Sequence, residues 1–376
     1  MDIPSIKILS SDLLLLDEID LYTSLQYTRS WQGIGSFELH IIGNPQSIQT
    51  GNIIMLGGDG HRAGVIRAVT KKVGVNGIET TATGQTLNGF LSQRLLLQSE
   101  NSANCGYFAV PTANAAVKTV PAETILKNPV IACIRDVGVR NMPITVATNQ
   151  KRGIETNWIS RYEILSDVLQ AASEYCDCGW EVYIDLSKRQ FIFDMVEGVD
   201  RSVSQNKNSR VILSRDFESI DSLTYSIDQS NYKNVAYCGG VGEDFDRLVV
   251  AVTADENIPE GFNRFEIFED CGTLEAAETD TALSIYDEGR HKLESYKLTE
   301  TLTAEISQSG AFEYLKDWNL GDLVTVRDKE LNLQQDLRIT EVTESYEADS
   351  IKLTVRLGTS PLRLGRVIRR IRPSIR

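Results

Sequence analysis

Catalysis and metal binding need particular residue types at particular spacings, and this sequence offers few of them. The closest pair of cysteines is Cys176 and Cys178, in the segment EYCDCGW. A Cys-x-Cys pair can supply two metal ligands, but a structural zinc site needs four, and His40, His61 and His291 all lie far away in sequence. We therefore predict no metal site, and we expect both cysteines to be small core residues near a helix end.

A glycine-rich segment, GGDGHRAG at residues 57–64, is a second candidate, because phosphate-binding loops are also rich in glycine. It lacks the Gly-Lys-Ser/Thr ending of such a loop, and a strand-like segment rather than a helix follows it. We predict that these residues form a hairpin loop and that the protein binds no cofactor.

The histidines are poorly placed to act as general bases. His40 alternates with Phe37 and Leu39 and so falls on the opposite strand face, His61 lies in the glycine-rich loop, and His291 lies on an acidic helix-like segment. We expect all three at the surface or at an interface. The 52 acidic residues leave a glycosidase pair open, but we predict no enzyme activity and no catalytic residues.

Charge and length set further bounds. The 376 residues predict two to three domains, and the net charge of −14 disfavours specific nucleic-acid binding, which needs clustered basic residues. The N-terminus lacks a basic region before its short apolar run, and no segment reaches about 18 apolar residues, so we predict neither a signal peptide nor a membrane span. In such a chain we expect the six cysteines to stay reduced.

The last fifteen residues differ from the acidic body. They contain six arginines and no acid: Arg363, Arg366, Arg369, Arg370, Arg372 and Arg376. One reading is a solvated terminus. The other is a docking segment that pairs with an acidic partner through bidentate contacts.

The order of the elements predicts four regions. Residues 1–99 are strand-like and end in a short amphipathic helix, QTLNGFLSQRLLL, which predicts a first β-barrel domain. Residues 100–210 predict an α+β middle domain with two helices, one ending before Pro129 and one stopped by Gly179, followed by a hairpin. Residues 211–361 predict a second β-barrel domain with an inserted helix at about 274–296, and residues 362–376 form the basic tail.

The two β regions share an internal repeat. GNIIML at 51–56 matches GDLVTV at 321–326, IRAVT at 66–70 matches ITEVT at 339–343, and IETTATG at 78–84 matches IKLTVRLG at 351–358. A weaker match pairs SLQYT at 24–28 with SLTYS at 222–226, with the helix inserted in the second copy. Order and spacing agree as well as composition, which favours duplication of a small antiparallel barrel. The predicted fold class is mainly β with α+β insertions.

These segments together resemble a known family. SLQYTRSWQGIGSFELHI, the strand-to-helix step IETTATGQTLNGFLSQRLL, the helix and hairpin of residues 162–193 and the late strands of residues 319–358 are similar to the tail-hub or baseplate-hub proteins of tailed bacteriophages and phage-tail-like particles. The similarity includes the N-terminal hub region of tail-associated proteins of Gram-positive phages. It is one of layout and covers most of residues 5–360.

The resemblance implies a virion structural protein, made in the bacterial cytoplasm and located at the tail tip or baseplate. It implies a homotrimer whose two barrels per chain form a pseudo-hexamer, which adapts the six-fold tail tube to a three-fold central spike or fibre. The implied partners are the tail tube or a distal tail protein, the spike and the tape-measure protein. The alternatives are a β-rich carbohydrate or cell-surface binding module, which exposed tryptophans would support, and a cell-wall hydrolase.

Overall fold

The structure is a computed structural model that describes residues 3–75, 77–97, 107–111, 119–134, 138–254, 258–271, 285–286, 289–290, 292–293, 296, 299–307, 310–347 and 350–358. The chain divides into two compact units. The first comprises Met1–Thr224 and Leu302–Pro361, and the second includes Tyr225–Thr301.

The first β module contains seven strands that follow one another in sequence. They are β1 (Ile6–Leu9), β2 (Leu15–Ile19), β3 (Ser24–Ser30), β4 (Ser36–Ile42), β5 (Ile53–Leu56), β6 (Ala63–Gly74) and β7 (Gly77–Thr86). They pair in the order β3-β4-β7-β6-β5-β1-β2. On β4 the side chains of Phe37, Leu39 and Ile41 are buried, as the period of two predicts.

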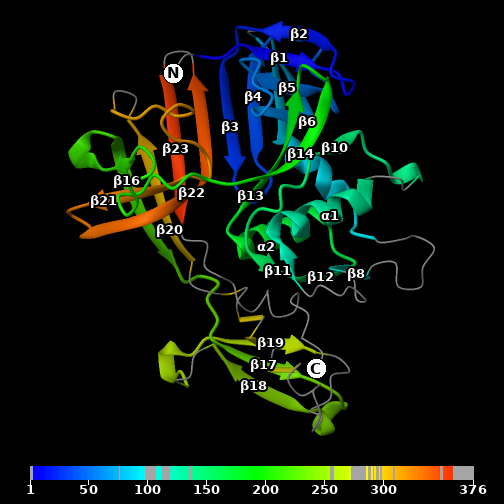
Figure 1. Ribbon diagram of the computed structural model, residues 1–376, viewed down its shortest axis with the longest axis vertical. Helices are drawn as coiled ribbons and strands as arrows, with labels where there is room; N and C mark the ends of the chain where they lie inside the picture. The colour runs from blue at the N-terminus through cyan, green and yellow to red at the C-terminus, as the bar shows by residue number, and fades with distance from the viewer. Residues whose placement is uncertain are drawn as a thin grey trace. The chain divides into compact units, whose positions relative to one another are not determined.

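The second β module is built from later segments. It contains β15 (Ile212–Leu213), β16 (Ile220–Asp228), β20 (Thr299–Ile306), β21 (Leu323–Asp328), β22 (Leu333–Glu347) and β23 (Ser350–Gly358). The order is β16-β20-β23-β22, and β21 pairs with both β22 and β15. Because β22 also pairs with β3, the two modules form one 13-stranded sheet, in which strands about 300 residues apart in sequence lie side by side (Figure 1).

The strand pairings of the two modules coincide in register. In the first module Ile54 of β5 lies opposite Gly64 of β6, and in the second Val324 of β21 lies opposite Leu337 of β22. These partners are related by the same offsets, 270 and 273, that relate the sequence repeats. Both β6 and β22 also carry a register shift at the same place, between Ile66 and Ala68 and between Ile339 and Glu341.

The repeated glycines have the conformation that the sequence predicts. Gly51 has φ +91° and Gly321 has φ +87°, a region that disfavours side chains. Each amide donates to a carbonyl of the second strand after it, Gly51 to Ile66 of β6 (2.9 Å) and Gly321 to Ile339 of β22 (2.8 Å). The weaker match is also reproduced in topology, because β3 is the neighbour of β4 just as β16 is the neighbour of β20.

An α+β part lies between the modules in sequence. Its helices are α1 (Ala122–Ile134) and α2 (Leu165–Cys176), and its strands are β8 (Tyr107–Val110), β9 (Val120–Pro121), β10 (Ile144–Val146), β11 (Glu155–Thr156), β12 (Trp158–Arg161), β13 (Gly179–Asp185) and β14 (Gln190–Val196). The 3-10 helix η1 (Leu87–Gln93) precedes this part, and η2 (Gly138–Arg140) lies between α1 and β10. A third, η3 (Arg215–Phe217), lies between β15 and β16 of the second module.

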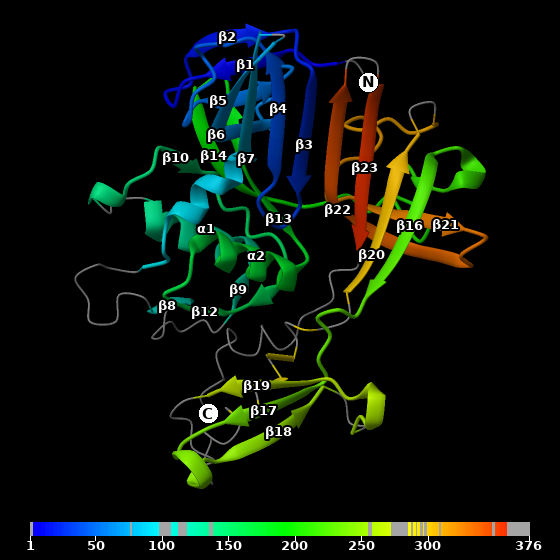
Figure 2. The same ribbon diagram turned by 180° about the vertical axis from the view of Figure 1, so that it is seen from behind.

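This part shares a core with the first module. On β5, Ile53 and Met55 face the α+β part, whereas Ile54 and Leu56 face the core of the module. Burial on both faces explains why this strand is a continuous apolar run rather than an alternating one. Figure 2 shows α1 and α2 from behind, below the strands of the first module.

Three local predictions need correction. Helix α1 does not stop before Pro129 but continues to Ile134, because its second half is buried in the same core as its first, which offsets the hydrogen bond lost at proline. Helix α2 ends at Cys176, and the left-handed conformation of Asp177 (φ 49°) makes the cap, so Gly179 begins β13 instead of stopping the helix. The segment after β7 is the 3-10 helix η1 rather than an α-helix.

The second unit contains a sheet of its own. Its strands are β17 (Val235–Gly239), β18 (Val249–Thr253) and β19 (Glu266–Asp270), with 3-10 turns η4 (Asp244–Asp246) and η5 (Gly261–Asn263). They lie in sequence between β16 and β20, so the insertion in the second repeat is larger than a single helix. The helix predicted at 274–296 falls largely outside the described residues, and 285–286, 289–290 and 292–293 within it are helical.

The fold class, mainly β with helices, is confirmed. The domain boundaries remain predictions. No helix in the described parts of the chain is long and apolar enough to cross a membrane. The six arginines of the basic tail lie outside the described residues.

Candidate assembly site

The two β modules meet where β3 pairs with β22, and polar and apolar side chains surround this joint. Its backbone is the antiparallel pairing of β3 with β22, which runs from Glu341 opposite Ser30 to Glu347 opposite Ser24. The hydroxyl oxygens of Thr28 and Thr343 lie 3.0 Å apart across this pair.

A buried ion pair fixes the same joint from the first module. Arg62, in the loop before β6, contacts the carboxylate of Glu344 on β22 and donates to the hydroxyl of Tyr346 (2.7 Å). Tyr346 in turn donates to Glu344 (2.6 Å). Arg62 is 8% exposed and Glu344 is fully buried, so each charge depends on the other for compensation.

Trp31 connects the joint to the α+β part. It follows β3 directly, and its amide donates to the carbonyl of Thr340 at the β22 bulge (2.9 Å). Its ring packs against two glycines from different parts of the chain. A Cβ atom on Gly179 would lie 2.5 Å from the ring, and one on Gly321 would lie 2.1 Å from it. Only glycine fits at these two positions, which explains a second role for the glycine that begins the repeat.

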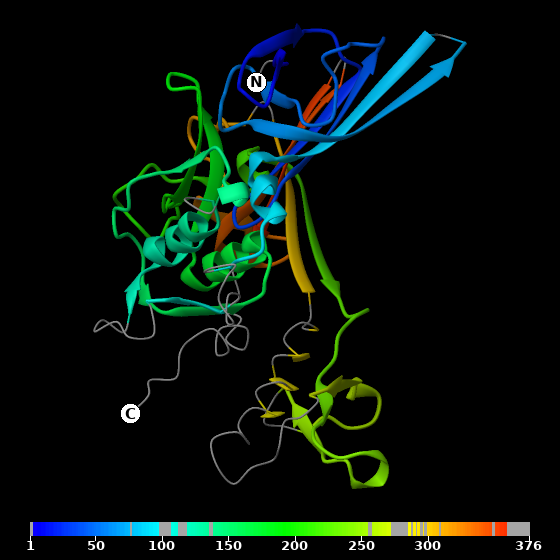
Figure 3. The same ribbon diagram turned by 90° about the vertical axis from the view of Figure 1, so that its right-hand side faces the viewer.

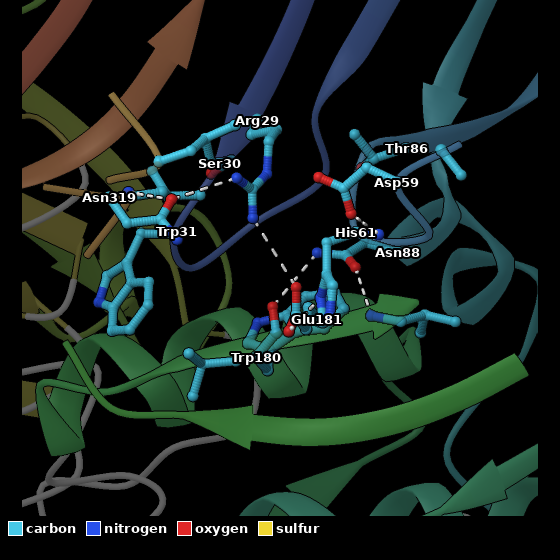
Figure 4. A pocket seen from close by; sticks show the side chains of 15 residues that line it. Arg29, Ser30, Trp31, Asp59, His61, Thr86, Asn88, Trp180, Glu181 and Asn319 are labelled. Atoms are coloured by element: carbon cyan, nitrogen blue, oxygen red, sulfur yellow. Dashed lines mark hydrogen bonds and ion pairs between the residues drawn. The ribbon is translucent and has the colours of Figure 1, made fainter. Parts of the chain in front are cut away.

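A cavity of about 220 Å³ lies beside Trp31 (Figure 4). Arg29 of β3 points into it and forms an ion pair with Glu181 of β13, with 3.8 Å between Nη2 and Oε2. Arg29 also donates to Tyr314 (3.1 Å) and to Asn319 (3.3 Å) of the second module. One guanidinium therefore joins three parts of the first unit.

His61 completes this arrangement from the glycine-rich loop. Its Nδ1 lies 3.0 Å from Oε1 of Glu181, and its ring stacks on Tyr183 at 4.4 Å between centroids. The hydrogen bond to Glu181 raises the pKa of His61 above its ordinary value, against the opposing effect of burial. Burial would lower the pKa of Arg29, but the attraction of Tyr314 and Glu181 outweighs it and the pKa is raised.

The arrangement is suited to holding parts together rather than to proton transfer. The carboxylate of Glu181 contacts two side chains at once, Arg29 and His61. Asn88 of η1 also connects the first module to β13. Its side chain donates to the carbonyl of Gly33 (2.8 Å) and accepts from the amide of Val182 (2.8 Å). The cavity is thus lined by side chains that bridge the β modules and the α+β part.

The structure places the residues that the sequence singled out as follows. Cys176 and Cys178 are buried at the end of α2, and burial raises the pKa of both thiols. The glycine-rich segment is the hairpin loop between β5 and β6, as predicted. His40 contacts Glu38 with 2.7 Å between Nε2 and Oε1, on the solvent face of β4.

Sequence reasoning missed the role of several residues. Arg29, Arg62, Glu181 and Glu344 carried no local signal, because their partners are up to 290 residues away. All four tryptophans are at most 3% exposed, so they offer no surface to a carbohydrate. The one sequence signal for a role of Trp31 is its position directly after β3, a strand that belongs to the repeat.

Comparison with solved structures identifies the class to which this fold belongs. It is similar to the 43 kDa tail protein of prophage MuSo2 from Shewanella oneidensis, with a TM-score of 0.54 and 13% identity over 95% of this chain and 99% of the other. It is also similar to a tail protein from Neisseria meningitidis MC58, with a TM-score of 0.51 and 15% identity over 96% and 98% of the two chains. The fold is therefore that of phage tail proteins.

The particular family follows from the sequence. The chain belongs to the Siphovirus ReqiPepy6 Gp37-like protein family, whose model matches residues 5–359. No curated protein matches the sequence. The predicted resemblance to phage tail proteins is confirmed, and with it a structural role in the tail or baseplate and a place in the virion or a tail-like particle.

Proposed function

We propose that the protein is a structural tail hub in which three copies form a ring of six near-equivalent β modules. The ring adapts the six-fold symmetry of a tail tube to a three-fold spike or fibre. The observation that carries this proposal is the duplication itself, because the two modules repeat the same strand pairings, the same bulge and the same glycine turn. A trimer of a duplicated chain presents six similar surfaces.

The joint between the modules supports the proposal. A ring that transmits load needs modules held at a constant angle. Three kinds of contact hold the two modules together: the β3–β22 pairing, the Arg62–Glu344 ion pair and the packing of the Trp31 ring on Gly321. The polar groups around the cavity are engaged with one another across these parts. We therefore infer a structural rather than a catalytic function for this site.

The partners follow from the ring. We propose the tail tube or distal tail protein on the six-fold side, the central spike or fibre on the other, and the tape-measure protein as a further contact. We also propose that the arginine tail, residues 363–376, docks on an acidic neighbour. Deleting these residues should leave a folded oligomer that assembles poorly into particles, and unchanged particle assembly would contradict docking.

The test of the ring is the mass of the purified protein in solution. Light scattering after size-exclusion chromatography should give about 126 kDa for the protein alone, three times the 41.9 kDa chain, or, after addition of the tube or spike protein, a complex that contains three copies of it. A mass of one chain under all of these conditions would exclude the hub function.

A further inference from the structure

The strand β22 has neighbours on both edges over most of its length, whereas the distal half of its repeat β6 has a neighbouring strand on one edge only in the described part of the chain. One edge of β22 pairs first with β21, along Leu333–Arg338, and then with β3, along Glu341–Glu347. The same edge of β6 pairs with β5 only along Ala63–Val65. Beyond Val65, the sole strand beside β6 in the described part of the chain is β7. The distal half of β6 extends with β7 as a long hairpin (Figure 3).

The strand β16 shows the complementary difference. Its repeat β3 lies between β4 and β22, whereas β16 pairs with β20 and ends the sheet on that side, as far as the structure describes it (Figure 2). Among the described residues, β16 and the distal half of β6 therefore each have an edge without a neighbouring strand, where the corresponding strands β3 and β22 are paired with each other.

We propose that β16 of one copy adds to the distal half of β6 of the next copy, antiparallel and in the register of β3 with β22. This inference rests on the ring proposed above and names the surface that closes it. Applying the offsets of the repeat, 273 for β6 and 198 for β16, places Val69 opposite Ile227, Thr70 opposite Ser226 and Val73 opposite Leu223.

The residue types agree with this register. Thr28 and Thr343 meet through their hydroxyls at 3.0 Å within the chain. Their repeats are Ser226 and Thr70, so the position keeps two hydroxyl side chains, and both are exposed in the monomer. Paired hydroxyls across neighbouring strands contribute to sheet stability.

Apolar exposure points to the same two strands. Val73 is 79% exposed, although the corresponding residue of β22, Tyr346, is fully buried. Ile227 on β16 is 54% exposed. A long strand edge with exposed apolar side chains is a template for pairing with another chain. Addition of β16 to β6 would give each an apolar neighbour across the strands, Leu223 beside Val73 and Val69 beside Ile227.

The charges of the two strands are opposite. The distal half of β6 carries Lys71 and Lys72 and no acid, whereas β16 carries Asp221 and Asp228 and no base. Lysines on an edge also discourage pairing of β6 with a second β6, because like charges would meet. The complementary signs favour the heterologous contact, which closes into a ring when repeated three times.

The test is a disulfide placed at the predicted register. The variant Thr70→Cys with Ser226→Cys should form intermolecular disulfides under a mild oxidant and migrate as covalent dimer and trimer on a non-reducing gel. The pair Thr28→Cys with Thr343→Cys is the matched control inside the chain, and it should form a disulfide that leaves the monomer mass unchanged. The unsubstituted protein controls for its native cysteines.

A second control tests the register. In the variant Thr70→Cys with Ser222→Cys, the second cysteine is four residues from the predicted partner, about 14 Å along the strand, so little covalent trimer should form. Both variants keep the lysines and aspartates, which leaves the electrostatic attraction unchanged. Circular dichroism would verify that each variant is folded.

The outcomes separate the two proposals. A trimer by light scattering with a strong Thr70–Ser226 crosslink supports both. A trimer in which this pair fails to crosslink, or crosslinks no better than the Thr70–Ser222 pair, overturns the inferred surface and leaves the hub function standing. A chain that stays monomeric with its tail partners overturns the ring, and the surface with it.

Discussion

At the scale of the residue, the contact of Trp31 with Gly321 can be tested against Gly51, the glycine at the corresponding position of the first module. Gly321 has both a left-handed backbone and a close contact with the Trp31 ring, whereas Gly51 has the same backbone with open space around it. Alanine substitutions at Gly51 and at Gly321 therefore measure separately the free energy lost to backbone strain and that lost to a clash with Trp31.

We expect Gly51→Ala to lower the free energy of unfolding by about 1 kcal/mol, because alanine is disfavoured at positive φ. Gly321→Ala should cost about 1–3 kcal/mol more, since its methyl group would overlap the Trp31 ring. Chemical denaturation of both variants measures the difference. Equal losses would show that Trp31 does not pack on Gly321 in solution.

The buried ion pair makes a second prediction at this scale. Glu344→Ala should lower the free energy of unfolding by about 3–5 kcal/mol, because Arg62 would keep a buried charge without its partner. Glu341→Ala, on the same strand, removes a partly exposed contact with Arg356 of 3.8 Å and should cost less than about 1 kcal/mol. Similar losses in the two variants would contradict a buried pair.

At the scale of the element, helix α1 depends on a charge network that titrates in acid. Glu123 is fully buried and accepts from Lys127 (2.6 Å) and Arg152 (2.9 Å). Burial would raise the pKa of Glu123, but these bonds lower it to about 2 from 4.5.

The sign of the pH effect follows from this shift. Because the folded pKa is lower than the unfolded one, the carboxylate stabilises the fold above about pH 4.5, and the contribution is lost as the pH falls toward 2. Urea unfolding between pH 5 and 3 should show a steeper loss for the natural chain than for Glu123→Gln. Parallel pH profiles would contradict the network.

The sequence predicted elements better than their partners. Alternation located β4, and the repeat located β5 with β21 and β6 with β22, because apolar period and turn chemistry are local signals. It missed the pairing of β3 with β22, since nothing within either strand specifies a partner about 300 residues away. It also ended α1 too early, because burial on both sides of Pro129 is a tertiary effect.

At the scale of the whole molecule, we expect the proposed pairing of β16 with β6 between copies to repeat the pairing of β3 with β22 within the chain. If β16 adds to β6 through opposite charges, the association should weaken with salt. Lys71→Glu with Lys72→Glu should reduce the trimer fraction, and adding Asp221→Lys with Asp228→Lys should restore it at least in part. A trimer fraction unaffected by the first pair of changes would argue against this edge.

The most direct measurement of the central claim is electron microscopy of the isolated oligomer viewed along its symmetry axis. The duplicated modules predict a three-fold ring with six similar β modules around the opening. Neighbouring modules should be joined alternately within a chain, by β3 with β22, and between chains, by β16 with β6. A ring with three β features, a two-fold particle or single chains would contradict the account.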